Sequence, residues 1–249
     1  MKMCSKVDQT ATLSPQDNYF PEVLENCKEI CYNVENAKAK WRKPDEEVRI
    51  MAVTKTVPPE KVNFAVAQGF KLLGENRVQE FLSKKEAYDK SAEVQFIGHL
   101  QTNKVKQIVG EVDMIDSVDS VKVAKEIGKI SAKKGIVTDV LVEINIGEEA
   151  SKFGLDPSEL TETLCEISEI GSVRVKGLMA IPPICDSSAE IRKFFMNMNR
   201  MFLDIKAKKL DNISMDILSM GMSGDYVGAI LEGSTMVRVG SSLFGKRVY

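Results

Sequence analysis

The stretch EVRIMAVTKTVPPEKVNFAVAQGFKLLG, residues 47–74, decides the fold. It opens with a short run rich in Val and Ile, continues with a segment that starts at two prolines and ends at Gly69, and closes with a second apolar run. Proline at the start of a helix and glycine just past its end are typical positions for these residues. The stretch therefore predicts a strand, a helix and a second strand, the unit from which parallel sheets are built.

This alternation continues to the end of the chain. The expected strands cover residues 47–53, 70–74, 93–98, 112–118, 138–146, 173–181, 214–221 and 235–240. The expected helices after them cover residues 58–69, 76–88, 102–109, 120–135, 156–171, 187–209 and 225–233, with Thr102 as the cap of the third. Eight such strands in roughly 200 residues predict an α/β fold, a closed (β/α)8 TIM barrel. We expect an extra N-terminal helix, over residues 19–41, before the first strand.

An open, doubly wound sheet is the alternative fold for such a pattern. It needs fewer strands and usually carries a glycine-rich first turn, whereas the first turn here, KTVPPE (55–60), contains no glycine. We therefore expect one barrel domain over residues 19–249, preceded by a polar tail over residues 1–18.

The composition and the charge exclude several classes of function. Hydrophobic residues make up 43% and charged residues 28% of the 249 residues, as in ordinary globular domains. A formal net charge of −2 provides no basic field for nucleic acid. No apolar run reaches the roughly 18 residues needed to cross a bilayer, and the N-terminus lacks the apolar stretch of a secretory signal. We expect a cytoplasmic protein that binds neither nucleic acid nor membranes.

The five cysteines indicate neither a disulfide framework nor a zinc site. Cys27 and Cys31 are four apart in a helical pattern, so both fall on its apolar face. We favour core positions for them over a reactive or metal-binding pair. There is no CxxC pair, and His99 is the single histidine, so we expect no metal site.

Residues that can carry chemistry follow the expected strands, because the active sites of these barrels lie where the strands end. The loops GMSGD (221–225) and VGSSLFG (239–245) follow the last two strands and supply glycines and hydroxyl groups. Loops at these two places form the usual phosphate site of such barrels. Ordinary turn chemistry explains each loop alone, but their joint location favours a phosphate site. The segment DSVDS (116–120), at the end of the fourth strand, offers no residue that we single out.

Two cations and one histidine at strand ends each have two interpretations. Lys55 is either solvated or buried enough to lower the pKa of its amine and let it attack a carbonyl. A phosphate site across the same opening favours a phosphorylated aldehyde bound to Lys55 as a Schiff base. Arg238 alternates with Val237 and Val239, so it points either into the barrel opening or outward to a helix carboxylate. For His99, both a core or capping role and contact with a bound ring are open.

Seven motifs together resemble one known family, the pyridoxal 5′-phosphate (PLP) homeostasis proteins. In the family's order and spacing they are AVTKTVP (52–58), GENRVQE (74–80), FIGHLQTNK (96–104), INIGEEASKFG (144–154), GLMAIPP (177–183), MGMSGDY (220–226) and VRVGSSLFG (237–245). The match extends from about Phe20 to Phe244, nearly the whole chain. The resemblance implies a single-domain PLP-binding barrel related to the N-terminal barrel of alanine racemase.

The resemblance also assigns roles to individual residues. It implies that Lys55 forms the Schiff base with PLP, that Arg238 contacts the pyridine nitrogen, that Asn76 lines the pocket, and that the phosphate ligands are Ser223, Gly240 and Ser241. The family often has threonine where this chain has Ser241, and serine keeps the hydroxyl group. We assign no catalytic residue and no metal ligand.

An arginine beside the pyridine nitrogen limits what such a site can do. PLP is a strong electron sink when an acidic partner keeps that nitrogen protonated. Arginine stays charged and leaves the nitrogen unprotonated, which weakens the sink. A racemase also needs a second acid–base group, which alanine racemase takes from a separate domain, and we expect no such domain before Tyr249. We therefore expect a protein of intracellular PLP homeostasis that holds PLP on Lys55 and delivers it, with little or no amino-acid turnover.

Two other functions are alternatives at this point. One is a PLP-dependent amino-acid racemase or decarboxylase, and the other is a cofactor-free barrel with Lys55 as an aldolase-type lysine. The expected partners are PLP, apo forms of PLP-dependent enzymes and free amino acids. We expect the chain to be a monomer.

Overall fold

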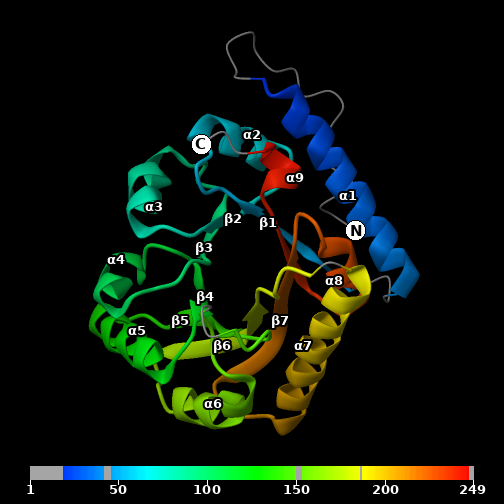
Figure 1. Ribbon diagram of the computed structural model, residues 1–249. Helices are drawn as coiled ribbons and strands as arrows, with labels where there is room; N and C mark the ends of the chain where they lie inside the picture. Colours follow the sequence, from blue (N-terminus) through cyan, green and yellow to red (C-terminus); the bar gives the residue numbers. More distant parts are fainter. Residues whose placement is uncertain (1–18, 42–45, 150–152, 186, 247–249) are drawn as a thin grey trace.

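The computed structural model describes residues 19–41, 46–149, 153–185 and 187–246. Its strands are β1 (Arg49–Val53), β2 (Leu72–Glu75), β3 (Glu93–Phe96), β4 (Met114–Val118), β5 (Thr138–Ile144), β6 (Val173–Ala180), β7 (Ile213–Met222) and β8 (Met236–Val239). They pair in parallel in sequence order, and β8 pairs with β1, so the sheet closes into a barrel (Figure 1). The predicted α/β TIM barrel is confirmed. The predicted polar tail, residues 1–18, lies outside the described residues.

Helices surround the barrel (Figure 1). They are α2 (Pro59–Ala67), α3 (Val78–Lys84), α4 (Val105–Ile108), α5 (Val121–Lys134), α6 (Leu160–Ser168), α7 (Ser188–Lys208), α8 (Tyr226–Leu231) and α9 (Ser241–Phe244), with 3₁₀ turns η2 (Lys85–Ala87), η3 (Thr102–Lys104) and η4 (Pro157–Glu159). The predicted N-terminal helix is present as α1 (Pro21–Trp41). None of the helices in the described residues combines the length and the apolar character that a membrane span requires.

The interior of the barrel contains an apolar layer and, next to it, a polar one. The apolar layer consists of Met51, Leu72, Met114, Leu141, Met179 and Met236, whose side chains pack together. Side chains alternate between the two faces of a strand, so residues two positions further on also face the interior. On three strands these residues are Asp116, Glu143 and Arg238, all of them buried. The polar layer therefore lies toward the end of the barrel where the strands finish.

Helix α1 covers one side of the barrel by packing against α8 and α9 (Figure 1). Its buried face includes Cys27 and Cys31, so the predicted core positions of both cysteines are confirmed. The Asn26 side chain donates a hydrogen bond of 2.9 Å to a backbone carbonyl of α9, and Asn33 donates one of 3.0 Å to the Tyr226 hydroxyl. Burial raises the pKa of the Cys27 thiol to about 12, so this thiol stays protonated.

The structure differs from the predicted elements in two places: it contains one additional short helix, and one predicted helix cap is absent. Helix α9, which directly follows β8, was not predicted, because the four residues of its single turn carry no apolar periodicity. The predicted cap at Thr102 is wrong. Thr102 is instead the first residue of η3, and the preceding Gln101 makes no side-chain hydrogen bond to the turn.

Candidate functional site

A cavity of about 450 Å³ opens at the end of the barrel where the strands finish. Its lining includes every residue to which the sequence resemblance assigns a role: Lys55, Asn76, Ser223, Arg238, Gly240 and Ser241. They come from the ends of β1, β2, β7 and β8, so barrel closure brings together residues that are distant in sequence. The cavity occupies the place where barrels of this kind carry their sites.

Lys55 lies in the turn that ends β1, and the chain is fixed on both sides of it. Thr54 is buried, and its hydroxyl donates a hydrogen bond of 2.7 Å to the Glu75 carboxylate. Thr56 has a φ of 63°, a left-handed conformation that is uncommon for a β-branched residue. The N–H of Thr56 donates to the Glu80 carboxylate. These contacts place the half-buried Lys55 in the wall of the cavity.

The loops after β7 and β8 bring several hydrogen-bond donors to one point. The backbone N–H groups of Gly240 and Ser242 donate to the Ser223 hydroxyl oxygen at 3.0 and 3.2 Å. The Ser242 hydroxyl also lies 3.2 Å from that oxygen. Both residues lie at the start of α9, where backbone N–H groups have no partner within the helix. Donors that converge in this way suit an anion such as phosphate.

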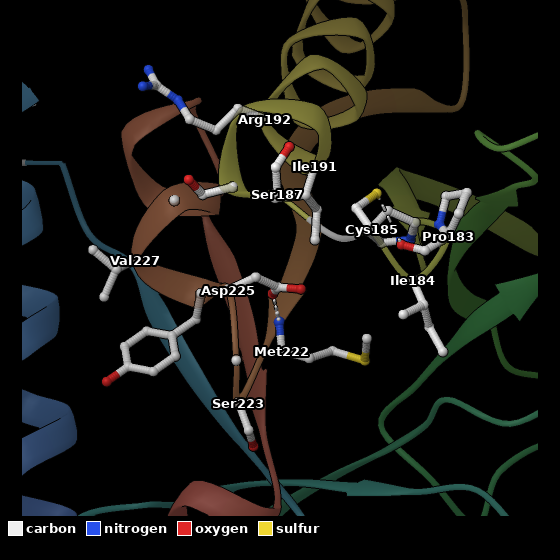
Figure 2. Close-up of a pocket in the computed structure, with 15 residues that line it drawn as sticks. Pro183, Ile184, Cys185, Ser187, Ile191, Arg192, Met222, Ser223, Asp225 and Val227 are labelled. Atoms are coloured by element: carbon white, nitrogen blue, oxygen red, sulfur yellow. Dashed lines mark hydrogen bonds between the residues drawn. The ribbon is translucent and has the colours of Figure 1, made fainter.

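The loop between β7 and α8 has a tightly specified shape. Gly221 has a φ of 92°, and a Cβ at this position would lie only 2.5 Å from the Ala229 Cβ, so only glycine fits. The Asp225 carboxylate then accepts a hydrogen bond of 2.5 Å from the Met222 N–H, which Figure 2 shows as a dashed line. These contacts hold Ser223 at the point where the donors converge.

A second cavity, of about 470 Å³, lies beside the first. Residues 222–225 line both cavities, so this short loop separates them. On its other side the second cavity is bounded by the loop after β6 and the start of α7 (Figure 2). The side chain of Ile184, which is fully exposed, projects from that loop beside the cavity (Figure 2).

Arg238 points into the barrel, so of the two orientations that the sequence left open the inward one is correct. It is 3% exposed. Its guanidinium donates to the Ser219 hydroxyl at 2.6 Å and to the Ala180 carbonyl at 2.8 Å. A guanidinium has five N–H donors, so these two bonds leave Arg238 with donors for a ligand in the cavity.

Two buried acids in the polar layer were missed by the sequence reasoning. Asp116 is fully buried, and within the described residues neither of its carboxyl oxygens has a hydrogen-bond partner. Burial raises the pKa of Asp116 to about 8, although the charge of Arg238 opposes this shift. Burial likewise raises the pKa of Glu143 to about 7, again against Arg238. The available signal was alternation, since each acid follows an interior apolar residue by two positions.

His99 lines the cavity and contacts an aromatic ring of this chain. Its imidazole stacks on the Phe153 ring, with 3.7 Å between the ring centroids and an interplanar angle of 12°. His99 Nδ1 also lies 3.2 Å from the Asp119 carboxylate. Phe153 was also missed by the sequence reasoning, because it lies in a loop where no periodicity predicts burial or exposure.

The fold and the site together define the class of this protein. A family profile described as the alanine racemase N-terminal domain matches residues 26–248. Alanine racemase from Clostridium difficile 630 shares the fold with a TM-score of 0.70, at 18% identity, over 91% of this chain and 58% of that chain. The chain is a barrel of the alanine racemase N-terminal type.

The curated relatives identify the particular family. Pyridoxal phosphate homeostasis proteins from Aquifex aeolicus (strain VF5) and Escherichia coli (strain K12) are 40% and 32% identical to this chain, over 90% and 92% of it and 98% of each relative. The structure of PipY from Synechococcus elongatus PCC7942 with PLP bound matches with a TM-score of 0.75 at 30% identity, over 86% of this chain and 99% of that chain. This chain belongs to the family of pyridoxal phosphate homeostasis proteins.

Proposed function

We propose that this protein binds PLP, holds it as a Schiff base on Lys55, and serves intracellular PLP homeostasis by storing and delivering it. The observation that carries the proposal is a single cavity whose lining brings together Lys55, Arg238 and the hydrogen-bond donors around Ser223. The names of the relatives and the PLP-bound structure of PipY support it.

The residues of the cavity fit the separate parts of PLP. The N–H groups of Gly240 and Ser242 converge on an oxygen, as a phosphate requires, and Ser223 and Ser241 add hydroxyl donors. Lys55 supplies an amine in the wall of the same cavity. These groups bind and orient the ligand, and Asn76 would line the pocket beside it.

Arg238 favours storage and delivery over amino-acid turnover. When bound, PLP supplies an aldehyde carbon and an electron sink whose strength depends on a protonated ring nitrogen. Arg238 keeps its charge and can only donate hydrogen bonds, so it stabilises the unprotonated form of a ring nitrogen placed against it. The proposed function therefore includes little or no amino-acid turnover.

The remaining parts of the proposal concern the setting of this site. We propose that residues 19–249 act as one cofactor-binding domain and that the protein works as a monomer in the cytoplasm. Apo forms of PLP-dependent enzymes and free amino acids are the proposed recipients of the PLP, because both present an amine that can replace Lys55.

A transfer experiment tests this function. Protein loaded with PLP and freed of excess ligand is mixed with an apo PLP-dependent enzyme, and recovery of that enzyme's activity is followed. We expect the loaded wild-type protein to restore activity, and Lys55→Ala, after the same loading and washing, to restore much less, because it retains less PLP.

The same preparation distinguishes a carrier from an enzyme. Amino acids are incubated with loaded protein in deuterated water, and exchange of the α-hydrogen is measured. We expect no exchange at an enzymatic rate. Exchange with a rate constant on the order of 1 s⁻¹ or more would contradict the proposed function, because that is an enzyme's turnover.

A further inference from the structure

Part of the cavity wall is apolar. It is formed by Phe153 and Ile181, which lie in loops, and by Met222, the last residue of β7. Phe153 is 56% exposed and Ile181 is 38% exposed, although both are large apolar side chains. Apolar groups gathered at the mouth of a cavity, with few polar ones, are typical of a site for the apolar part of a small molecule.

Two acids line the cavity, Asp225 and Glu143, and Glu143 comes from a strand of the barrel. Glu143 lies one residue before the end of β5. This strand is opposite β1 in a closed barrel of eight strands, so Glu143 and Lys55 line the cavity from opposite sides. Glu143 is 7% exposed, and within the described residues its carboxylate makes no hydrogen bond. A buried carboxylate without a partner is costly, and a ligand with N–H donors removes that cost.

A comparison of the two acids that line the cavity favours Glu143 as the one that receives a cationic group. Asp225, the other acid in the wall, already accepts the Met222 N–H (Figure 2). The charged groups that act on Glu143 are Arg238 on β8, which favours its ionised form, and Asp119 after β4, which opposes it. Glu143 is thus the acid best placed to receive a further cation.

We propose that this part of the cavity binds a primary amine with an apolar body, with Glu143 receiving the ammonium group and accepting its proton, and with Phe153, Ile181 and Met222 receiving the apolar body. This inference rests on the proposed function and names the class of amine that takes the aldehyde from Lys55.

The proton movements of this exchange balance. An arriving ammonium group cannot attack a carbon until it loses a proton, which passes to a Glu143 oxygen. The neutral amine nitrogen then forms the new bond to the aldehyde carbon, and the bond between that carbon and Lys55 Nζ breaks. The two remaining protons of the amine move to Lys55 Nζ, and Glu143 returns the third, so Lys55 leaves as an ammonium group. A carboxyl whose pKa is about 7 suits both transfers near neutral pH.

The first test uses protein without PLP, so it does not depend on the Schiff base. Calorimetric titration with 3-methylbutylamine is compared with titration with 3-methylbutanoate, which has the same apolar body and the opposite charge. We expect the amine to bind and the carboxylate not to bind. Glu143→Gln should weaken amine binding about tenfold or more, since a charge-assisted hydrogen bond is lost. Glu162→Gln, on the exposed face of α6, serves as the matched control and should have no effect.

Two results would overturn the inference: equal binding of the amine and the carboxylate, or amine binding that is unchanged in Glu143→Gln. A second variant checks the apolar wall. Ile181→Asn should weaken 3-methylbutylamine and leave methylamine unchanged, because only the longer amine reaches that wall. Equal effects on both amines would contradict the assignment of Ile181.

The second test uses loaded protein and follows the absorbance of the bound chromophore after addition of either amine. We expect faster release with 3-methylbutylamine than with methylamine, and about tenfold slower release in Glu143→Gln. Equal rates in wild type and Glu143→Gln would overturn the proton-accepting role. Failure of the wild-type protein to form the chromophore at all would refute the proposed function instead, while the titration of the PLP-free protein still decides the amine site.

Discussion

Asp116 and Arg238 show how one buried cation shapes its surroundings. Arg238 donates its hydrogen bonds to the Ser219 hydroxyl and the Ala180 carbonyl. Asp116 and Glu143 therefore interact with the Arg238 guanidinium only through its charge. Without direct hydrogen bonds, burial outweighs that charge, and the pKa values of Asp116 and Glu143 both rise. In the folded protein both acids therefore hold protons at a pH where the unfolded chain has lost them.

The first prediction concerns Asp116→Asn and the pH dependence of stability. The pKa of Asp116 is about 8 in the folded protein and about 3.9 in the unfolded chain, so the folded state holds this proton more tightly. The resulting contribution to the free energy of unfolding is complete below about pH 3.9 and is lost as the pH rises toward about 8. The variant lacks this group, so its free energy of unfolding should fall less steeply with pH, by up to about 1.4 kcal/mol per pH unit. Urea denaturation at pH 5, 6 and 7 measures both slopes.

The exposed Asp211 provides the control for this prediction. Asp211→Asn should keep the wild-type slope, because this substitution is on the surface and removes no buried carboxyl group. If Asp116→Asn showed the wild-type slope as well, the interior of the barrel would be far more polar than its packing implies. Glu143 remains in both variants, so part of the pH dependence should persist.

Two sequence signals, the alternation of side chains along a strand and the position of strand ends, predicted some of the site residues but not others. Lys55 could be singled out because it follows an apolar strand closely, and Ser223 because it lies in a glycine-rich loop at the phosphate position. The orientation of Arg238 could not be decided, because alternation gives two faces and does not say which is the interior. Asp116 was overlooked because a lone acid in a strand normally marks the solvent-facing side.

Hydrogen bonds connect the loops after β7 and β8, because Ser223 in the first loop accepts hydrogen bonds from backbone N–H groups at the start of α9 in the second.

The second prediction is that Ser223→Ala weakens PLP binding roughly tenfold, through loss of one hydroxyl donor to a charged phosphate. Pyridoxal, which lacks the phosphate, should bind the variant and the wild type equally. Equilibrium titration with each ligand, followed by absorbance, measures the difference.

Ser83→Ala is the matched control, since this exposed serine donates only to a carbonyl in its own helix. It should bind both ligands as the wild type does. A Ser223→Ala variant that lost pyridoxal and PLP affinity to the same extent would indicate that Ser223 contacts another part of the ligand. The phosphate site would then have to lie elsewhere.

Long periodic elements were predictable, and short ones were not. Helices such as α5 and α7 carry a regular apolar stripe with a serine cap, and both sequence signals agree with the structure. Helix α9 has one turn, too short for any stripe, and its existence depends on the strand and loop before it. The error at Thr102 has the same origin, because the 3₁₀ turn η3 begins one residue earlier than an α-helical cap would allow.

For the molecule as a whole, α1 is held against the barrel by a stripe of buried side chains and by the hydrogen bonds of Asn26 and Asn33 to α9 and α8.

The third prediction is that Cys27 does not react with a thiol reagent in the native protein, whereas the exposed Cys165 does. Burial shields the Cys27 thiol and raises its pKa to about 12, so the reactive thiolate is scarce. Peptide mass analysis after timed labelling identifies which cysteine has reacted.

Denaturant makes this labelling informative about α1. In urea, Cys27 should begin to react at the concentration where the whole barrel unfolds, if α1 is part of one cooperative unit. Labelling of Cys27 in native buffer at the rate of Cys165 would contradict the packing of α1 described above.

The barrel itself was predictable because eight alternating units leave few other ways to bury both faces of a parallel sheet. What sequence could not supply is the set of contacts that closure creates between distant strands. Glu143 and Lys55 line one cavity only because β5 and β1 lie on opposite sides of a closed barrel. Such a juxtaposition follows from the full topology and from no local pattern.

The central claim is a covalent bond between Lys55 and the aldehyde of PLP, and chemical trapping tests it most directly. Protein mixed with PLP is reduced with borohydride and digested, and the modified peptide is identified by mass. We predict that the added mass lies on Lys55 and is absent from Lys55→Arg, while Lys61→Arg, which changes a lysine near the same turn, keeps it. Modification of Lys61 or another lysine, with Lys55 unmodified, would contradict the account.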